Sequence, residues 1–272
     1  MVMQGGKQFI ALGSRLLNIP EVLTLGVKPN FLDYTPRERE LIDAANLILF
    51  PTVGYAQFFN TMGKTIFPSL ETYLYADEKI MQTTLFYLQK INHPRTIFYY
   101  PRHHNDILKN FAFPFVGKIP RRSAQGRGVF LIRNGDDLGK YLSLTKIAYI
   151  QEYVPHEKDL RVILINYDPV LAYWRFRKKG NFRANIFQGG RISFDHIPLE
   201  GIALARKAAI KCRFDDVGMD LIQHKNNWYL IEANMKYGRK GLQMKGLDIK
   251  QLIRRKLLSG EISSAGRLRV TH

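Results

Sequence analysis

The spacing of apolar and polar residues changes along this chain, with one pattern before residue 114 and another after it. In residues 21–52, the apolar runs EVLTLGV and NLILFPT flank the more polar segment TPRERELIDAA. Thr35 suits a helix N-cap and Pro36 suits the first helical position, so the middle segment is predicted to be a helix between two strands. This order predicts a small α/β domain with a parallel sheet.

Apolar residues then recur at helical spacing through residues 70–91. The segment RTIFYY predicts a strand after them, and HNDILKNF predicts a short helix.

From residue 114 onward the pattern predicts antiparallel strand pairs with helices beside them. PFVGKIP and GVFLI predict two strands around the loop RRSAQGRG, followed by the helix DDLGKYLSL and the strand KIAYIQEYV. DLRVILINYDPVLAYWRFR predicts two long strands around NYDP, and VGMDLIQHKNNWYLIEAN predicts a hairpin around QHKNN. PLEGIALARKAAIKC and LDIKQLIRRKLLSG have the spacing of amphipathic helices. The fold class is therefore α+β.

Length and composition narrow the class of protein. A chain of 272 residues that is 46% hydrophobic has enough apolar surface for one large or two modest domains. The longest apolar stretch, LILFPTVGYAQFF, is broken by Pro51 and Gly54 and falls short of the roughly 20 apolar residues that cross a bilayer. The N-terminal segment lacks a secretory pattern. Cys212 is the single cysteine, which fits a reducing compartment, so we expect a cytoplasmic protein without a membrane partner.

Positive charge is concentrated in the second part of the chain. The net charge of the chain is +18. Residues 1–70 hold six Lys/Arg and five Asp/Glu, whereas residues 71–272 hold 35 Lys/Arg and 18 Asp/Glu. Such a field attracts polyanions, including nucleotides, acidic peptides and nucleic acid. Charge alone does not choose among them.

Glycines between two predicted strands suggest a phosphate-binding hairpin. Gly126 and Gly128 precede a strand rather than a helix, which excludes a Walker A loop and a Rossmann turn. A glycine-rich tip lets backbone amides approach phosphates closely, and Lys118 on the incoming strand could reach the same anion. The alternative is an ordinary flexible hairpin.

The stretch YIQEYVPHEKDLRV offers groups that suit a nucleoside. The backbone of residues 152–154 could pair with the edge of a base, and the carboxylate of Asp159 could accept ribose hydroxyls. The alternative is a strand followed by a solvated charged loop.

A basic run follows in WRFRKKGNFRANIFQGG. Its guanidinium groups could bind a carboxylate or phosphate bidentately and stabilise charge on a transferring phosphoryl group. The alternative is a solvated basic edge, which we expect for Lys178 and Lys179.

Three oxygen-bearing side chains lie on the last predicted hairpin. Glu232 and Asn234 fall on one face of a strand because side chains repeat every second residue, and Asp220 ends the partner strand. Hard oxygen ligands in an incomplete set suit Mg²⁺ completed by nucleotide phosphates. The alternative is a hairpin whose polar side chains share a face without a common role.

Taken in order, these elements resemble the ATP-grasp carboxylate–amine ligases, most closely the RimK-type branch that adds glutamate to a ribosomal protein. Lys118, QGRGV, QEY, DLR, FRANIFQGG, MD and EANMKYG match the pattern of that branch, and the resemblance runs from about residue 77 to 258. It implies an ATP-grasp fold, in which two α+β subdomains grip ATP, after a short α/β pre-ATP-grasp domain. The implied domains are residues 1–75, 76–154 and 155–272.

The resemblance also implies a role for each matching residue. The ATP phosphates would meet Lys79 and Lys118 under a loop that includes Gln125, Gly126 and Gly128, and the base and ribose would meet Glu152, Tyr153, Val154 and Asp159. The phosphates and the reacting carboxylate would meet Arg161, Arg175 and Asn185, with Arg175, Asn185 and Lys118 as the catalytic set. One or two Mg²⁺ ions, or Mn²⁺ in their place, would be held by Asp220, Glu232 and Asn234.

The implied reaction is ATP-dependent amide formation through an acyl phosphate, which adds glutamate or another amino acid to an anionic small molecule or an acidic peptide or protein. The basic segment NMKYGRKG departs from the small residues and proline usual in the branch, so the substrate is left open. Two alternatives remain: a non-catalytic nucleic-acid or ribosome-binding protein with this fold, and a phosphotransferase without ligation. Homo-oligomerisation is left open.

Overall fold

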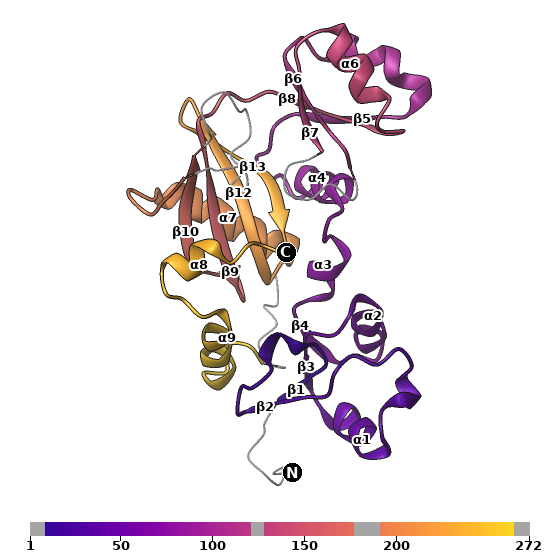
Figure 1. Cartoon of the computed structure of the whole chain (residues 1–272), viewed down its shortest axis with the longest axis vertical. Helices are drawn as coiled ribbons and strands as arrows, with labels where there is room; N and C mark the ends of the chain where they lie inside the picture. Colours follow the sequence, from indigo (N-terminus) through magenta and orange to yellow (C-terminus); the bar gives the residue numbers. More distant parts are fainter. Residues whose placement is uncertain (1–8, 121–127, 177–190, 264–272) are drawn as a thin grey trace. The chain divides into compact units, whose positions relative to one another are not determined.

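The computed structural model describes residues 9–120, 128–176 and 191–263, which form three β-sheets (Figure 1). Contacts within the chain divide it into two units. The first comprises Met1–Leu74, Arg213–Asp216 and Gly238–His272, and the second comprises Tyr75–Cys212 and Val217–Tyr237. The domain boundaries predicted at residues 75 and 154 stay predictions.

The first unit contains the predicted parallel sheet. Its strand order is β2 (Val22–Thr24), β1 (Phe9–Ala11), β3 (Leu47–Leu49) and β4 (Thr65–Phe67). Its helices are α1 (Pro36–Ala44), α2 (Val53–Thr61), α3 (Leu70–Leu74), α8 (Lys240–Met244) and α9 (Ile249–Leu258), with 3₁₀ turns η1 (Ser14–Leu16) and η2 (Phe31–Asp33). The predicted cap of α1 is confirmed, because Thr35 and Glu38 form a reciprocal capping box that satisfies two backbone donors.

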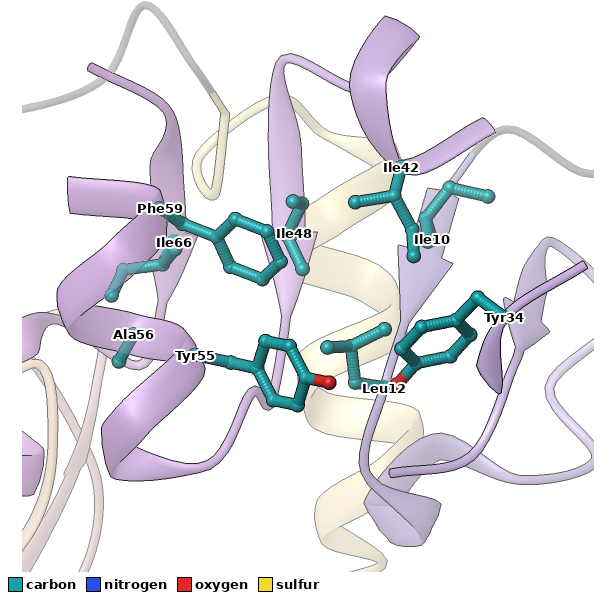
Figure 2. Packing of buried hydrophobic residues seen from close by; sticks show 9 residues of the cluster. All are labelled: Ile10, Leu12, Tyr34, Ile42, Ile48, Tyr55, Ala56, Phe59 and Ile66. Atoms are coloured by element: carbon teal, nitrogen blue, oxygen red, sulfur yellow. The ribbon is translucent and has the colours of Figure 1, made fainter. Parts of the chain in front are cut away.

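The core of the first unit lies between this sheet and its helices. Figure 2 shows aliphatic side chains from β1, β3 and β4 meeting aromatic rings from α2 and from the segment before α1. The members of the cluster are Ile10, Leu12, Tyr34, Ile42, Ile48, Tyr55, Ala56, Phe59 and Ile66. Helix α9 is bound to the same unit by polar contacts, since Arg254 Nε donates to Glu21 at 2.8 Å and Lys250 Nζ donates to Leu17 O at 3.0 Å.

The second unit begins with a helix and an antiparallel sheet, which we call the first sheet of this unit. The strand order is β5 (Thr96–Tyr99), β8 (Ala148–Glu152), β6 (Phe115–Lys118) and β7 (Val129–Ile132). The helices are α4 (Lys79–Leu88), η3 (Pro101–Asp106), α5 (Ile107–Asn110) and α6 (Gly135–Leu142). The helical spacing predicted through residues 70–91 is interrupted: α3 and α4 are separate, and Asp77 between them has φ +61°.

The second sheet of this unit has the strand order β11 (Ile192–Ser193), β10 (Asp168–Phe176), β9 (Lys158–Ile165), β12 (Asp216–His224) and β13 (Asn227–Asn234). Both predicted hairpins are present, each closed by a two-residue turn with positive φ at both central positions, which matches the right-handed twist of the strands. Helix α7 (Leu199–Cys212) packs on one face of this sheet (Figure 1), where Trp174 and Trp228 stack with centroids 5.9 Å apart. The opposite face carries charged side chains as well as buried apolar ones such as Ile163 and Ile165.

Among the helices that the structure describes, none has the length and apolarity needed to cross a membrane.

Candidate functional site

Charged side chains form a row across the face of the second sheet that α7 does not cover. Gly201 of α7 packs on Leu160, and strand alternation therefore turns Asp159 and Arg161 to the opposite face. In register, Arg175 lies beside Asp159 on neighbouring strands, Asp220 lies beside Glu232, and Gly218 lies beside Asn234. Sheet register thus brings residues that are up to 75 positions apart in the chain into what we call the charged row. Its members are Asp159, Arg161, Arg175, Asp220, Glu232 and Asn234.

Asp220 is the centre of the charged row. Its carboxylate accepts two hydrogen bonds from Arg161, at 2.6 and 2.5 Å, and lies 2.9 Å from Arg175 Nη2. Asn234 Nδ2 donates to the same carboxylate at 3.0 Å. Asp220 is only 4% exposed, and although burial alone would raise its pKa, the two guanidinium groups hold that pKa below the ordinary value.

Arg175 joins Asp220 to a second carboxylate. Its Nε donates to Asp159 Oδ1 at 2.5 Å, and both side chains are buried. Burial raises the pKa of Asp159 to about 6, against the opposing pull of the Arg175 guanidinium. The sequence suggested ribose binding for Asp159, and the structure shows its carboxylate engaged by an arginine; the ribose role stays a prediction.

Two lysines approach the end of the charged row that lies on β13. Lys79 Nζ on α4 is 3.6 Å from Glu232 Oε1. Lys118 Nζ, from the end of β6, donates to Ile231 O at 3.4 Å and lies 5.3 Å from the centre of the Tyr149 ring. Burial lowers the pKa of Lys118, while Glu232 and Asp220 oppose that shift.

A β-bulge explains why the carbonyl of Ile231 is available to Lys118. Asp220 pairs with Glu232 and Leu221 pairs with Leu230, so Ile231 is the extra residue on its strand. A bulge turns the backbone of the extra residue out of the regular ladder. The bulge thus places an acceptor beside Glu232, at the point where β6 of the other sheet arrives.

The residues predicted to meet adenine lie at the end of β8 and just after it, and two of them have other contacts. Glu152 N donates to Arg95 O at 2.9 Å, and its carboxylate accepts from Arg95 N at 2.8 Å. The carbonyl of Val154 lies 2.7 Å from His156 Nδ1. Tyr153 is partly buried between them. The structure does not join these three residues to the charged row by any described contact, and their role stays a prediction.

The predicted phosphate loop is described only at its end. Gln125 and Gly126 lie outside the described residues, as does Asn185 of the basic run. Gly128 is buried, and its carbonyl accepts from Ile119 N at 2.7 Å, which closes the hairpin between β6 and β7.

Several residues that support the site carry little or no signal in the sequence. Tyr141 Oη donates to Lys118 O at 2.7 Å and accepts from Tyr149 N at 2.9 Å, so it holds the backbone from which Lys118 projects. The Tyr149 hydroxyl is 2.8 Å from Thr83 Oγ1, and burial raises the Tyr149 pKa to about 12. Gln82 of α4 binds the backbone of Ala233, between two predicted metal ligands. Its position one helical turn after Lys79 is the only hint that the sequence gives.

The predicted metal ligands form an all-oxygen set. Asp220, Glu232 and Asn234 supply two carboxylates and one amide; within the described ranges, no group of three or more His, Cys, Asp or Glu side chains is placed to hold a metal ion. Oxygen donors of this kind fit Mg²⁺, which keeps several waters and takes further ligands from phosphates. Both carboxylate oxygens of Asp220 are bound by Arg161 and Arg175. Asp220 can therefore bind a metal ion only after these two arginines bind another anion.

A model of the RimK-like ATP-grasp domain matches residues 76–257. The chain belongs to this family. A probable alpha-L-glutamate ligase of Vibrio parahaemolyticus is 28% identical to this chain over 185 residues. The match covers 65% of this chain and 61% of the relative. A ribosomal protein bS6–L-glutamate ligase of Escherichia coli is 26% identical over 219 residues, 74% of this chain and 73% of the relative.

Solved structures agree with the ATP-grasp fold. D-alanine–D-alanine ligase of Bacillus anthracis, in complex with ATP, superposes with a TM-score of 0.65 at 12% identity, covering 92% of this chain and 95% of that one. The predicted RimK-type resemblance and the ATP-grasp α+β fold are confirmed by these matches. The family is one of ATP-binding ligases, and its named relatives above are ligases.

Proposed function

We propose that this chain is an ATP- and Mg²⁺-dependent carboxylate–amine ligase that attaches glutamate, or another amino acid, to an anionic acceptor. The charged row carries the proposal. It combines two buried guanidinium groups with the oxygen donors Asp220, Glu232 and Asn234, and Lys79 and Lys118 lie close to its β13 end. A protein that only bound a partner through this fold would need neither the lysines nor the metal ligands.

The charges of this site favour an anionic nucleotide as the first occupant. Counted by formal charge, four cationic side chains lie among three carboxylates, which leaves a surplus of one positive charge. A guanidinium that binds a carboxylate bidentately binds a phosphate in the same geometry. Phosphates can therefore replace Asp220 as partners of Arg161 and Arg175, and Asp220 then becomes available together with Glu232 and Asn234. Bound there, Mg²⁺ would neutralise phosphate charge as a Lewis acid.

The reaction proceeds in two displacements. An oxygen of the acceptor carboxylate attacks the γ-phosphorus of ATP, the bond to the bridging oxygen breaks, and ADP leaves with an acyl phosphate remaining. The amine of the incoming amino acid then attacks the acyl carbon, the carbon–oxygen bond breaks, and phosphate leaves as the nitrogen loses a proton. Arg161, Arg175, Lys79 and Lys118 hold and neutralise the oxygens, and positioning accounts for most of the rate of such transfers.

The acceptor is proposed to be acidic. Residues 71–272 carry 35 Lys/Arg against 18 Asp/Glu, which attracts anionic molecules. The ligases named above act with glutamate, one of them on a ribosomal protein. An acidic peptide or protein tail, or a small polycarboxylate, fits both observations. Homo-oligomerisation and association with nucleic acid or ribosomes stay predictions.

The test measures ADP release with panels of acids and amines, together with the mass of the product. We expect ADP and phosphate to appear only when both substrates are present, with an amide as product. Arg175→Met should abolish turnover, whereas Arg206→Met, at a surface pair 3.8 Å from Asp168, serves as the matched control. A stable phosphorylated acid without amide would favour a phosphotransferase instead. Nucleotide binding without turnover on any pair would favour the non-catalytic alternative.

A further inference from the structure

Gln82 is a buried amide on α4 that lies against the strand bearing two of the proposed metal ligands. It is 2% exposed. Its Nε2 donates to Ala233 O and to Tyr75 O, both at 2.8 Å, and its Oε1 accepts from Ala233 N at 3.1 Å. The side chain therefore satisfies both backbone polar groups of Ala233, as a residue of a neighbouring strand would.

This contact is needed because β13 is at the edge of its sheet. The outward backbone groups of an edge strand require partners when they are buried. Ala233 lies directly between Glu232 and Asn234, whose side chains project to the opposite face of the strand from its own. Fixing both peptide groups of Ala233 therefore fixes the two Cα atoms that carry the proposed ligands.

Gln82 also ties the lysine on α4 to the same ligands. Lys79 precedes Gln82 by one helical turn, so the two side chains share a face of the helix. Lys79 Nζ lies 3.6 Å from Glu232 Oε1, and Lys118 holds the carbonyl of Ile231 on the other side of Glu232. The strand is thus held immediately before and immediately after Glu232 by side chains from outside its sheet.

We propose that Gln82 is a positioning residue of the metal and nucleotide site, setting Glu232 and Asn234 at the spacing that a phosphate-bound divalent cation requires. The inference rests on the proposed ATP- and Mg²⁺-dependent function. Residues that orient metal ligands without touching the metal typically contribute a factor of about 10–100 to metal affinity. A residue that only stabilised the edge strand would leave that affinity unchanged.

Asn92 provides a matched control, because it supports the same strand at its other end. Its side-chain Nδ2 donates to Trp228 O at 2.5 Å, and its backbone carbonyl accepts from Leu230 N at 2.9 Å. Asn92→Ala removes the side-chain bond to β13 and contacts neither ligand. Gln82→Met keeps the length and most of the volume of the side chain while it removes the hydrogen bonds to Ala233 and Tyr75, and a weaker one to Met235 Sδ at 3.9 Å.

The experiment titrates Mn²⁺ into each full-length protein by electron paramagnetic resonance, without nucleotide and with saturating ADP, after circular dichroism has confirmed folding. For Mn²⁺ with ADP we expect Gln82→Met to bind about 10- to 100-fold more weakly than the wild type, and Asn92→Ala to match the wild type. If Gln82→Met does not fold, Gln82→Glu replaces it; this variant keeps the acceptor for Ala233 N and should also weaken Mn²⁺ binding.

Two failures are distinguishable. Equal Mn²⁺ affinity in the Gln82 and Asn92 variants, with a tight wild-type complex, overturns the role of Gln82 and leaves the proposed function standing. A wild-type protein that binds no Mn²⁺ in the presence of ADP overturns the proposed function, and the positioning role with it.

Discussion

Replacing Asp220 by asparagine removes a negative charge from between two buried guanidinium groups. Asp220 is 4% exposed and Arg161 is 7% exposed, so solvent screens their interaction little. Arg175 keeps its contact with Asp159 at 2.5 Å, whereas Arg161 loses the carboxylate that its Nε and Nη2 bind. Removing one partner of a buried ion pair destabilises a protein by about 3–5 kcal/mol. Because an asparagine oxygen can still accept one hydrogen bond, we expect about 3 kcal/mol.

Tryptophan fluorescence during urea denaturation measures the loss of unfolding free energy in the sheet that contains Asp220. Both tryptophans of the chain, Trp174 and Trp228, lie in the same sheet as Asp220. The matched control is Asp168→Asn, which breaks an exposed pair 3.8 Å from Arg206 and should change the free energy of unfolding by about 0–1 kcal/mol. All measurements are first made in EDTA.

Nucleotide tests the proposed exchange of partners. If phosphates take over Arg161, ADP in EDTA should stabilise Asp220→Asn more than the wild type, because no carboxylate competes for the guanidinium. Adding Mg²⁺ should then stabilise the wild type further and the variant much less. A gap between variant and wild type that ADP leaves unchanged, or that equals the gap of the Asp168 control, would refute this reasoning.

Three further predictions concern packing and ionisation. Gly201→Ala should lower the free energy of unfolding in urea by about 1–3 kcal/mol, because the new Cβ would lie 2.6 Å from Leu160 Cδ2. The control Gly139→Ala, with open space around it, should raise that free energy by about 0.5–1 kcal/mol. A Gly201→Ala protein as stable as the wild type would contradict the packing. Burial raises the pKa of Asp215 from 3.8 to about 7, so the folded state holds its proton more tightly and stability should fall as pH rises between these values, by up to about 1.4 kcal/mol per pH unit. Asp215→Asn should flatten that fall, and identical pH profiles of stability would count against it. Burial also raises the pKa of the Cys212 thiol to about 12, so thiol reagents should label it slowly until urea unfolds the protein; equal rates in native and unfolded protein would be the contrary result.

The hairpins of the second sheet could be predicted because their sequences contain both the two-residue alternation of strands and the residues typical of a turn. Alternation and the turns at 166–167 and 225–226 fix the pairing next to each turn, as far as Leu221 with Leu230 in the second hairpin. The pairing of Asp220 with Glu232 depends in addition on the bulge at Ile231. β1 and β4 carry little such signal, since each has three residues. Helix α2 begins two residues after Pro51 and contains no charged residue, so its pattern does not separate it from an apolar strand.

The contents of the site were less predictable than its position. Sequence placed Arg161, Arg175 and Asp220 near phosphates and metal, but an arginine motif does not say whether its partner is a ligand or a carboxylate of the same protein. That choice depends on burial and register, which exist only in the folded chain. The roles of the bulge at Ile231 and of the Gln82 amide could not be predicted either, because each depends on contacts between segments distant in sequence.

Long-range contacts also group Arg213–Asp216 and helix α9 with the first part of the chain. Ser69 N donates to Asp215 Oδ1 at 2.8 Å, and Arg254 binds Glu21. These pairs are separated by more than 140 residues, and no local pattern announces them.

The fate of one oxygen atom tests the central claim most directly. A peptide ending in glutamate, labelled with ¹⁸O in its terminal carboxylate, is incubated with the protein, ATP, Mg²⁺ and glutamate, and the released phosphate is analysed by mass spectrometry. The account predicts that one ¹⁸O atom enters phosphate for each amide formed, because the attacking carboxylate oxygen stays on phosphorus when the amine displaces it. Amide formation with unlabelled phosphate, or with AMP and pyrophosphate as products, would contradict it.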